Sequence, residues 1–238
     1  MDRTARLSIV TATLNAAGQV PGLLSSLRAQ TDRNFEWVVA DGASSDGTLA
    51  LLQSVTDLNI VIRSQPDFGT YDGLNHAIQT ASGHYYIVVG ADDRLAPDAV
   101  ANYRRAIIDS GADIVAARVR YGDRIMQVKR GPVWLHGQFA LIAAHSVATA
   151  IRRDLHARYG DYTRRFPIAA DQYFIIRACA GGASRHEAAF IAGEFGTGGV
   201  SSIDRIGNAT EVFRVQLATG RSFFVQTLLL LLRLLRAR

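Results

Sequence analysis

Short apolar runs alternate with segments of helical periodicity over the first part of the chain. Leu7 to Thr13 is rich in β-branched residues, which is typical of a buried strand. Apolar residues at the spacing of one helix face follow at Val20, Leu23, Leu24 and Leu27. The alternation continues with strands expected at residues 35–40, 60–62 and 85–89, and with helices expected from Thr48 and at residues 71–82. This order predicts an α/β domain with a mainly parallel sheet flanked by helices.

The second half of the chain has a less regular pattern. Residues 114–121 have the composition of a strand, and residues 124–129 are candidates to pair with it. Asp171 to Ala180 has the apolar side of a helix, whereas residues 196–199 form a glycine-rich loop. We therefore expect one domain over residues 1–205 and a helical tail over residues 206–238.

Polar residues follow each of the four strands expected in the first half. They are Asn15, Asp41-Gly42, the segment 67–72 and Asp92-Asp93. Because ligands collect at the carboxyl ends of strands in such sheets, these residues are expected to share one crevice. The alternative is that Asn, Asp and Gly only serve turns and helix caps. That alternative is weaker for Asp92-Asp93, whose like charges repel unless a cation or partner is present.

Composition excludes several classes of protein. With 48% hydrophobic and 20% charged residues, the 238-residue chain can bury a substantial core and is not a disordered segment. The single cysteine, Cys179, excludes a disulfide framework and a cysteine-based structural zinc site within the chain. No apolar run approaches the roughly 20 residues of a membrane-spanning helix, and residues 1–15 lack a signal-peptide pattern. We therefore expect a soluble or peripheral protein of the cytosolic side.

The excess positive charge lies in the tail. The chain has 26 basic and 21 acidic residues, and the segment from Val212 to Arg238 holds five arginines and no acid. Nucleic-acid binders usually spread basic residues over a folded face, so no nucleic-acid partner is expected. As a helix, residues 223–235 would gather Ser222, Gln226, Arg233 and Arg236 near one stripe, with leucines and phenylalanines elsewhere. This pattern favours a membrane-surface anchor over the alternative, a helix packed on the domain or in a homodimer.

Several motifs in order resemble inverting family-2 glycosyltransferases of the GT-A fold. They are residues 8–15, 39–48, 65–75 and 90–93, then His145-Ser146, residues 170–172 and residues 198–201. The resemblance covers roughly residues 7–202 and is greatest to bacterial enzymes that build exopolysaccharide or lipid-linked saccharides. It implies a Rossmann-like, mixed but mainly parallel sheet, with a nucleotide-sugar half (about residues 1–95) and an acceptor half (about residues 96–205).

The resemblance implies a donor site at the strand ends. Asp41 corresponds to the residue that accepts a hydrogen bond from the nucleotide base, and Ser44 and Asp46 line the same loop, although Asp46 also suits a helix cap. Thr13 and Asn15 are expected near the base or ribose, with a turn residue as the alternative for Asn15. Further donor-binding residues are expected at Asp72, Asn75 and Asp92. Asp72 and Asn75 are three residues apart at the start of a helix and therefore share a face.

A divalent cation is also implied, because the departing nucleoside diphosphate carries charge that Mg²⁺ or Mn²⁺ can offset as a Lewis acid. Asp93 is the predicted direct ligand within the Asp92-Asp93 pair. Ala91 stands where the strict Asp-x-Asp motif has its first carboxylate, which leaves two-carboxylate chelation open.

Asp171 matches the family's general base, which removes the proton of the acceptor hydroxyl. Its alternative is an N-cap aspartate, because a helix is expected to follow. His145 is expected near the acceptor or diphosphate, with a packed core histidine as the alternative, and Gly199 and Ser201 are expected in a loop near the donor phosphates. Tyr71 is interpreted as a packing residue.

The leading hypothesis is thus a metal-dependent inverting transferase that moves a sugar, with UDP as the expected nucleotide, to a saccharide or polyprenyl-linked acceptor. Its expected location is the cytoplasm, peripheral at the inner face of the cell membrane. A nucleotidyltransferase shares such a core, but usually has a Gly-rich basic loop where this chain has Ala16-Ala17-Gly18. A non-catalytic binding protein would be favoured by the loss of Asp171 or Asp93, and both are present. A dinucleotide dehydrogenase is excluded, because no G-x-G-x-x-G follows the first strand.

Overall fold

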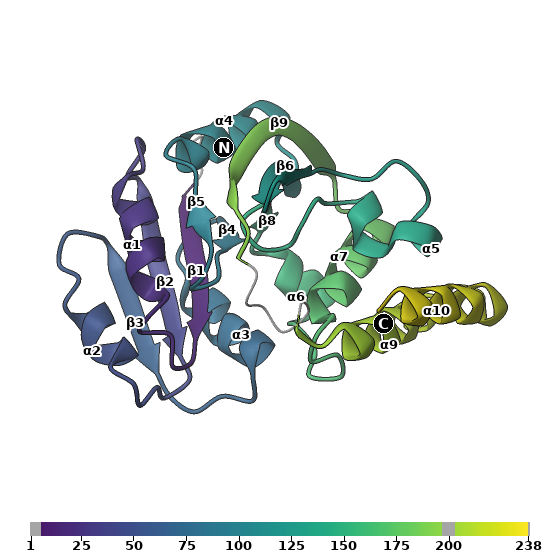
Figure 1. The fold of residues 1–238 in the computed structure, drawn as a ribbon. Helices are drawn as coiled ribbons and strands as arrows, with labels where there is room; N and C mark the ends of the chain where they lie inside the picture. Colours follow the sequence, from purple (N-terminus) through teal and green to yellow (C-terminus); the bar gives the residue numbers. More distant parts are fainter. Residues whose placement is uncertain (1–5, 197–202, 238) are drawn as a thin grey trace.

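The computed structural model describes residues 6–196 and 203–237. Within these residues, the strands form one nine-stranded sheet in the order β3-β2-β1-β4-β8-β6-β9-β5, with β7 paired to β6 (Figure 1). The strands are β1 (Leu7–Thr13), β2 (Phe35–Asp41), β3 (Ile60–Ser64), β4 (Tyr85–Val88), β5 (Arg94–Leu95), β6 (Ile114–Tyr121), β7 (Arg124–Met126), β8 (Thr149–Arg152) and β9 (Arg185–Glu194).

The first four strands are parallel and adjacent, as the sequence predicts. β1 pairs with β2 and β4, and β2 pairs with β3, so that Thr13 at the end of β1 is in register with Asp41 at the end of β2. All seven residues of β2 are buried, because helices cover both faces of this part of the sheet. A strand buried on both faces needs a nearly continuous apolar sequence, and such a run predicts the strand from the sequence.

Helices form a layer on each face of the sheet. One core cluster packs α1 (Val20–Arg28), α2 (Thr48–Gln53) and α4 (Ala99–Ser110) on one face. The other cluster packs α3 (Thr70–Thr80), α6 (Leu155–Tyr159) and α7 (Ala170–Ala180) on the opposite face. The helices expected from Thr48, at residues 71–82 and at residues 171–180 are therefore confirmed as α2, α3 and α7.

The second half makes the sheet mixed. β8 is antiparallel to both β4 and β6, β9 is parallel to β6, and the short β5 is antiparallel to β9. The expected pairing beyond residue 121 is confirmed as the β6–β7 hairpin. Between β7 and β8 lie a four-residue helix, α5 (Val133–His136), and a 3-10 helix, η1 (Gly137–Ala140).

The tail forms two helices, α9 (Arg205–Ala218) and α10 (Phe223–Ala237), at one end of the molecule (Figure 1). α9 packs on α7, and its Val215 joins the core cluster on that face. α10 packs along α9. In the part of the chain that the structure describes, no helix is long and apolar enough to cross a membrane.

Candidate active site

The ends of β1, β2 and β3 meet around the carboxylate of Asp41. This buried side chain accepts hydrogen bonds from the hydroxyls of Thr13 at 3.3 Å and Ser64 at 2.7 Å, and from the hydroxyl and the backbone N–H of Ser44, the latter at 3.1 Å. Burial would raise the pKa of the Asp41 carboxyl, but these donors more than offset it and hold the pKa below its ordinary value. The Asp41 carboxylate is therefore an ionised hydrogen-bond acceptor at the strand ends, where the sequence predicts the crevice.

Asn15 and Asp46 hold the neighbouring loops together. The backbone of Asn15 has a φ of 51°, in the left-handed region that Asn tolerates, and its side-chain oxygen accepts from the Ser45 N–H at 2.9 Å. Asp46 accepts from the backbone N–H groups of Ala17 and Thr48, each at 3.0 Å. This geometry suits the capping alternative for Asp46 at the start of α2. Donor contacts by Asn15 and Asp46 stay predictions.

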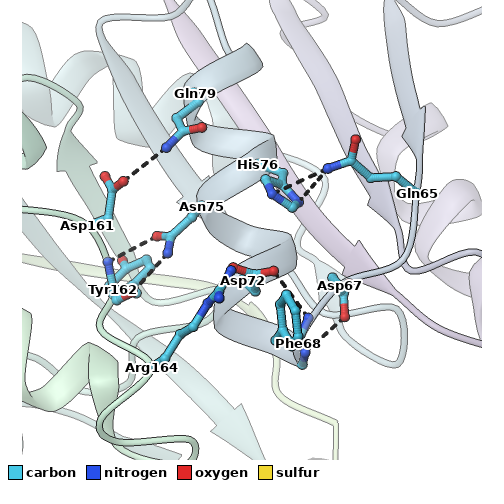
Figure 2. A network of polar contacts seen from close by, with 11 residues as sticks. Gln65, Asp67, Phe68, Asp72, Asn75, His76, Gln79, Asp161, Tyr162 and Arg164 are labelled. Atoms are coloured by element: carbon cyan, nitrogen blue, oxygen red, sulfur yellow. Dashed lines mark hydrogen bonds and ion pairs between the residues drawn. The ribbon is translucent and has the colours of Figure 1, made fainter.

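Asp72 and Asn75 share a face of α3, as predicted, but that face meets the segment 161–164 (Figure 2). One oxygen of Asp72 accepts from Nε of Arg164 at 3.1 Å and from Nη2 at 2.7 Å, and the other accepts from the Phe68 N–H at 3.1 Å. The Asn75 amide donates to the Tyr162 carbonyl at 2.8 Å and accepts from the Tyr162 N–H at 3.0 Å. These side chains thus join the two halves of the domain, a role that the sequence did not predict.

The Arg164 guanidinium of this network also lies over the ring of Phe68, 4.2 Å from its centroid. The ring itself is 80% exposed, so the cation and the aromatic face stand at the surface beside α3. They lie next to the loop that follows β3, and the guanidinium is paired there with the Asp72 carboxylate.

Asp92 and Asp93 follow β4, and they differ in burial. Asp93 is 1% exposed and accepts from the backbone N–H groups of Gly90 and Gly196, each at 2.7 Å, and from the Ser146 hydroxyl. Burial raises the pKa of the Asp93 carboxyl, although these donors oppose the effect. Asp92 is partly exposed. Gly199 and Ser201, expected near the donor phosphates, lie outside the described residues.

The geometry of Asp92 and Asp93 decides whether the pair can hold a cation. Among the described residues, no group of three or more His, Cys, Asp or Glu side chains is arranged to hold a metal ion. The two carboxylates nevertheless converge over Gly90, where an added Cβ would lie 3.1 Å from both Asp92 Oδ1 and Asp93 Oδ2. One or two carboxylates with substrate phosphates is a usual Mg²⁺ environment. The pair therefore fits a cation whose remaining ligands come from a diphosphate and water.

Asp171 lies in the first turn of α7, next to Tyr71 at the start of α3. Its Oδ1 accepts from the Tyr71 hydroxyl at 2.7 Å, and its Oδ2 accepts from the Gln138 amide at 2.8 Å. Both partners are neutral, so they hold the carboxylate in place without pairing its charge. The interpretation of Tyr71 as a packing residue was therefore incomplete, and Gln138 was missed. Burial and the adjacent Asp171 raise the pKa of the Tyr71 phenol, which keeps it a donor.

The backbone that precedes Asp171 is held by the tail. Glu211 of α9 is buried and accepts from the N–H groups of Ile168 and Ala169, at 2.8 and 3.0 Å. Free N–H groups at a helix start need an acceptor, and no side chain of α7 itself supplies one. Glu211 thus holds the two residues that precede α7. The N-cap position of α7 is Ala169, so the N-cap alternative for Asp171 is wrong, and the Asp171 carboxylate bonds to Tyr71 and Gln138.

His145 belongs to a chain of buried hydrogen bonds. Its Nε2 lies 2.6 Å from the Tyr162 hydroxyl, Tyr162 is 2.7 Å from the Tyr86 hydroxyl, and Tyr86 is 2.8 Å from Nε2 of His156. Burial lowers the pKa of His156 to about 4, so it is neutral near pH 7, and its Nδ1 faces the Gly160 carbonyl at 3.2 Å. Nδ1 must then carry the proton, so Tyr86 donates to His156, Tyr162 to Tyr86, and His145 to Tyr162. His145 therefore keeps its Nδ1 as an acceptor.

Solved structures share the fold. TarS of S. aureus in complex with UDP matches with a TM-score of 0.70 at 17% identity, over 93% of this chain and 68% of TarS. The mannosyltransferase PcManGT of Pyrobaculum calidifontis, in complex with GDP-Man and Mn²⁺, matches with a TM-score of 0.70 at 21% identity, over 91% and 65% of the two chains. At these identities the likeness shows the fold alone, and that fold is GT-A.

Sequence relatives define the family. A PGL/p-HBAD biosynthesis glycosyltransferase of Mycobacterium bovis (strain BCG / Pasteur 1173P2) is 33% identical over 181 residues, which cover 71% of this chain and 68% of the relative. An uncharacterized glycosyltransferase of Mycobacterium tuberculosis is 33% identical over 180 residues, which cover 72% and 68%. The model described as "Glycosyl transferase family 2" matches residues 8–160. The chain therefore belongs to glycosyl transferase family 2.

Proposed function

We propose that this protein transfers a sugar from a nucleotide-sugar to a hydroxyl of a saccharide or lipid-linked acceptor, with inversion, in the synthesis of a bacterial cell-surface saccharide. The observation that carries the proposal is the setting of Asp171. Asp171 is 8% exposed, each oxygen of its carboxylate is held by one neutral donor, and the chain belongs to a family of transferases. Such a group accepts a proton without first leaving an ion pair.

The reaction needs one displacement. The acceptor hydroxyl attacks the anomeric carbon from the side opposite the diphosphate, and the bond from that carbon to the diphosphate oxygen breaks, so the nucleoside diphosphate leaves with the electron pair and the configuration inverts. The proton of the hydroxyl passes to an oxygen of Asp171. Tyr71 and Gln138 keep the carboxylate aimed during this step, because rotation would cost their hydrogen bonds. His145, with Nδ1 as an acceptor, is suited to orient a hydroxyl of the acceptor or the sugar.

The nucleotide half is proposed at the strand ends. Asp41 would accept the hydrogen bond from the ring N–H of the base, with Thr13 and Ser44 around it, and UDP remains the expected nucleotide. A divalent cation, Mn²⁺ or Mg²⁺, would be held by Asp92 and Asp93 and would offset the charge of the departing diphosphate when bound. The presence of Mn²⁺ in the PcManGT complex supports this cofactor.

A direct test is a set of nucleotide-sugars offered to the full-length protein with Mn²⁺ or Mg²⁺. We expect one nucleotide class to raise the melting temperature and its sugar donor to be consumed, slowly by water and faster with an acceptor. A ligand at a concentration of about a hundred times its Kd stabilises the folded protein by roughly 2.7 kcal/mol, which is easily measured as a rise in the melting temperature. Stabilisation by no nucleotide-sugar would contradict the proposal.

Membrane contact is proposed from the orientation of α10. A surface helix normally buries its apolar stripe, yet here Gln226 is 0% exposed while Phe224 is 83% exposed. The polar stripe faces α5, where Gln226 donates to the Trp134 carbonyl at 2.7 Å. The exposed apolar side chains of α10 are Phe223, Phe224, Val225, Leu228, Leu231, Leu232 and Leu235. Such a face, on a segment whose sequence from residue 212 to 238 holds five arginines and no acid, suits the anionic inner leaflet of the cell membrane.

Replacing Phe224 and Leu228 together by Asp should abolish binding to vesicles of phosphatidylcholine and phosphatidylglycerol. Each large apolar side chain contributes roughly 1.5–3 kcal/mol when buried, so the loss should be at least about a hundredfold in affinity. Flotation of the protein with vesicles measures it. Ile108→Asp, at a residue that is 50% exposed on α4, is the matched control and should still bind. If the wild-type protein instead remains in solution as a dimer that the double variant dissociates, α10 is a dimer element and the membrane claim is wrong.

A further inference from the structure

A groove of about 890 Å³ lies on the face of the sheet that carries α7. Its lining comes from β6, from β9 and from the segment 127–131 that follows β7. At the start of β9, Arg185 is in register with Ile114 of β6, and Glu187 is in register with Ala116. Ile114 and Ala116 belong to the core cluster that includes α7, and residues opposite each other on paired strands share a face. The groove is therefore on the same side of the sheet as the helix that carries the proposed base.

Basic side chains dominate the lining of this groove. Four cations and one carboxylate line it, and they are Arg118, Lys129, Arg130, Arg185 and Glu187. The side chain of Arg118 is half-buried and the other four are exposed, so their charges are open to a ligand. None of the four cations forms an ion pair in the part of the chain that the structure describes, whereas Arg120, also on β6, pairs with Glu194. A concave site lined by one sign of charge attracts a ligand of the opposite sign, which here is an anion.

The uncharged part of the lining indicates what kind of anion fits. Among the described residues of the lining, the only large or small apolar side chains are Val128 and Ala140, so a hydrocarbon chain would bury little apolar surface there. The same residues include no Phe, Tyr or Trp ring on which a nucleotide base could stack. Gln127 and His136, together with Glu187, offer both donors and acceptors, which suit the hydroxyls of a sugar.

The groove also adjoins the segment that holds the proposed base. The Lys129 N–H donates to the Phe139 carbonyl at 2.7 Å, and Nη1 of Arg185 donates to the Leu141 carbonyl at 2.9 Å. Both carbonyls lie just after Gln138, whose side-chain amide donates to Asp171 at 2.8 Å. The short helix η1 therefore contacts the groove as well as the proposed base, so that one extended acceptor could reach both.

We propose that this groove binds an acidic saccharide, one that carries carboxylate or phosphate groups, as the part of the acceptor remote from the reacting hydroxyl. The four cations pair with its acidic groups, while Gln127 and Glu187 bind its hydroxyls. The proposal rests on the transferase function given above. It adds a second binding site for the acceptor, and a requirement for negative charge that neither the donor site nor Asp171 imposes.

The test is binding of two acidic oligosaccharides, tetragalacturonate and mannopentaose phosphate, to the full-length protein, measured by calorimetry without donor. At least one should bind about tenfold more tightly than its neutral form, the methyl ester or mannopentaose, because only the acidic form pairs with the cations. Exposed ion pairs are individually weak, so Arg118→Gln and Arg130→Gln should each weaken binding about threefold, and together about tenfold. Arg124→Gln, an exposed arginine of β7 outside the lining, is the matched control and should bind as the wild type does.

The other outcomes each overturn the proposal in a different way. Equal binding of the acidic and neutral forms would remove charge from the recognition, and binding that the double variant does not weaken would place the site elsewhere. Equally tight binding of inorganic phosphate would leave a simple anion site. Phosphatidylglycerol vesicles that bind in place of the oligosaccharides, and less well to the double variant, would make the groove a lipid headgroup site.

Binding of UDP, measured on the same variants, should match the wild type and shows that they fold. If neither acidic oligosaccharide binds while donor sugar is still consumed, the groove proposal fails and the transferase proposal stands.

Discussion

Asp171→Asn should lower the turnover of sugar transfer by roughly 10²–10⁴-fold while leaving donor affinity nearly unchanged. The amide has almost the shape of the carboxylate but cannot take the proton of the acceptor hydroxyl. Its oxygen can still accept from Tyr71 or Gln138, so the packing around α7 should survive. Steady-state kcat and a separate Kd for the nucleotide measure the two effects.

Asp154→Asn is the matched control, because Asp154 is an exposed aspartate just before α6, and it should keep full turnover. Tyr71→Phe removes one of the two hydrogen bonds to the base and should lower kcat by less, about tenfold, since Gln138 still holds the other oxygen. The assignment of the base would be wrong if Asp171→Asn lost nucleotide binding and kept its turnover.

The parallel half of the fold was predictable because burial on both faces leaves a strong signal. β2 is buried throughout, and its apolar run stands out between two helical patterns. β9 was missed for the opposite reason. Its first three residues, Arg185 to Glu187, are exposed and polar, so only residues 188–192 carry an apolar run, and the strand has no strict alternation. β8 is only four residues long and gives equally little signal.

The residues of the site were predictable where their place follows from their position next to a strand or helix in the sequence. The rule of strand ends predicted Asp41 in the crevice, and the family resemblance predicted Thr13 near the base. The two side chains are hydrogen-bonded. Contacts between distant segments were not predictable, because a single sequence does not say which surfaces meet. Tyr71 and Asp171 are 100 residues apart, and Asp72 and Arg164 are 92 apart. The i, i+3 spacing gave Asp72 and Asn75 a common face but not the segment that this face contacts.

In the C-terminal tail, too, the local pattern was predictable and the contact with a distant segment was not. The sequence predicts the polar stripe of α10, and Gln226 and Arg233 do share the side that faces α5. It does not predict that this stripe turns inward. The reason is α5, a four-residue helix whose carbonyl groups at Val133, Trp134 and Leu135 accept from the side chains of Gln216, Gln226 and Arg233. The leucines are thereby left at the surface.

Removing the cation, or a carboxylate that holds it, should have the second large effect on catalysis. A Lewis acid at the diphosphate contributes several kcal/mol to the transition state, so excess EDTA should lower turnover by roughly a hundredfold or more, with recovery on adding Mn²⁺. Asp92→Asn and Asp93→Asn should do the same without recovery. Asp123→Asn, an exposed aspartate in the β6–β7 turn, is the control and should behave as the wild type.

The two aspartates should differ in a second measurement, the melting temperature. Asp93 holds Gly90, Ser146 and Gly196 through its carboxylate, and an amide in its place would set an N–H₂ against those donors. Asp93 is also the more buried of the two, so Asp93→Asn should destabilise the protein by roughly 1–3 kcal/mol, more than Asp92→Asn does. Asp92→Asn is thus the cleaner test of the cation, and titration of UDP with and without Mn²⁺ shows whether its loss uncouples the two ligands. Undiminished turnover of the wild type in excess EDTA would remove the cation from the mechanism and leave the prediction for Asp171 standing.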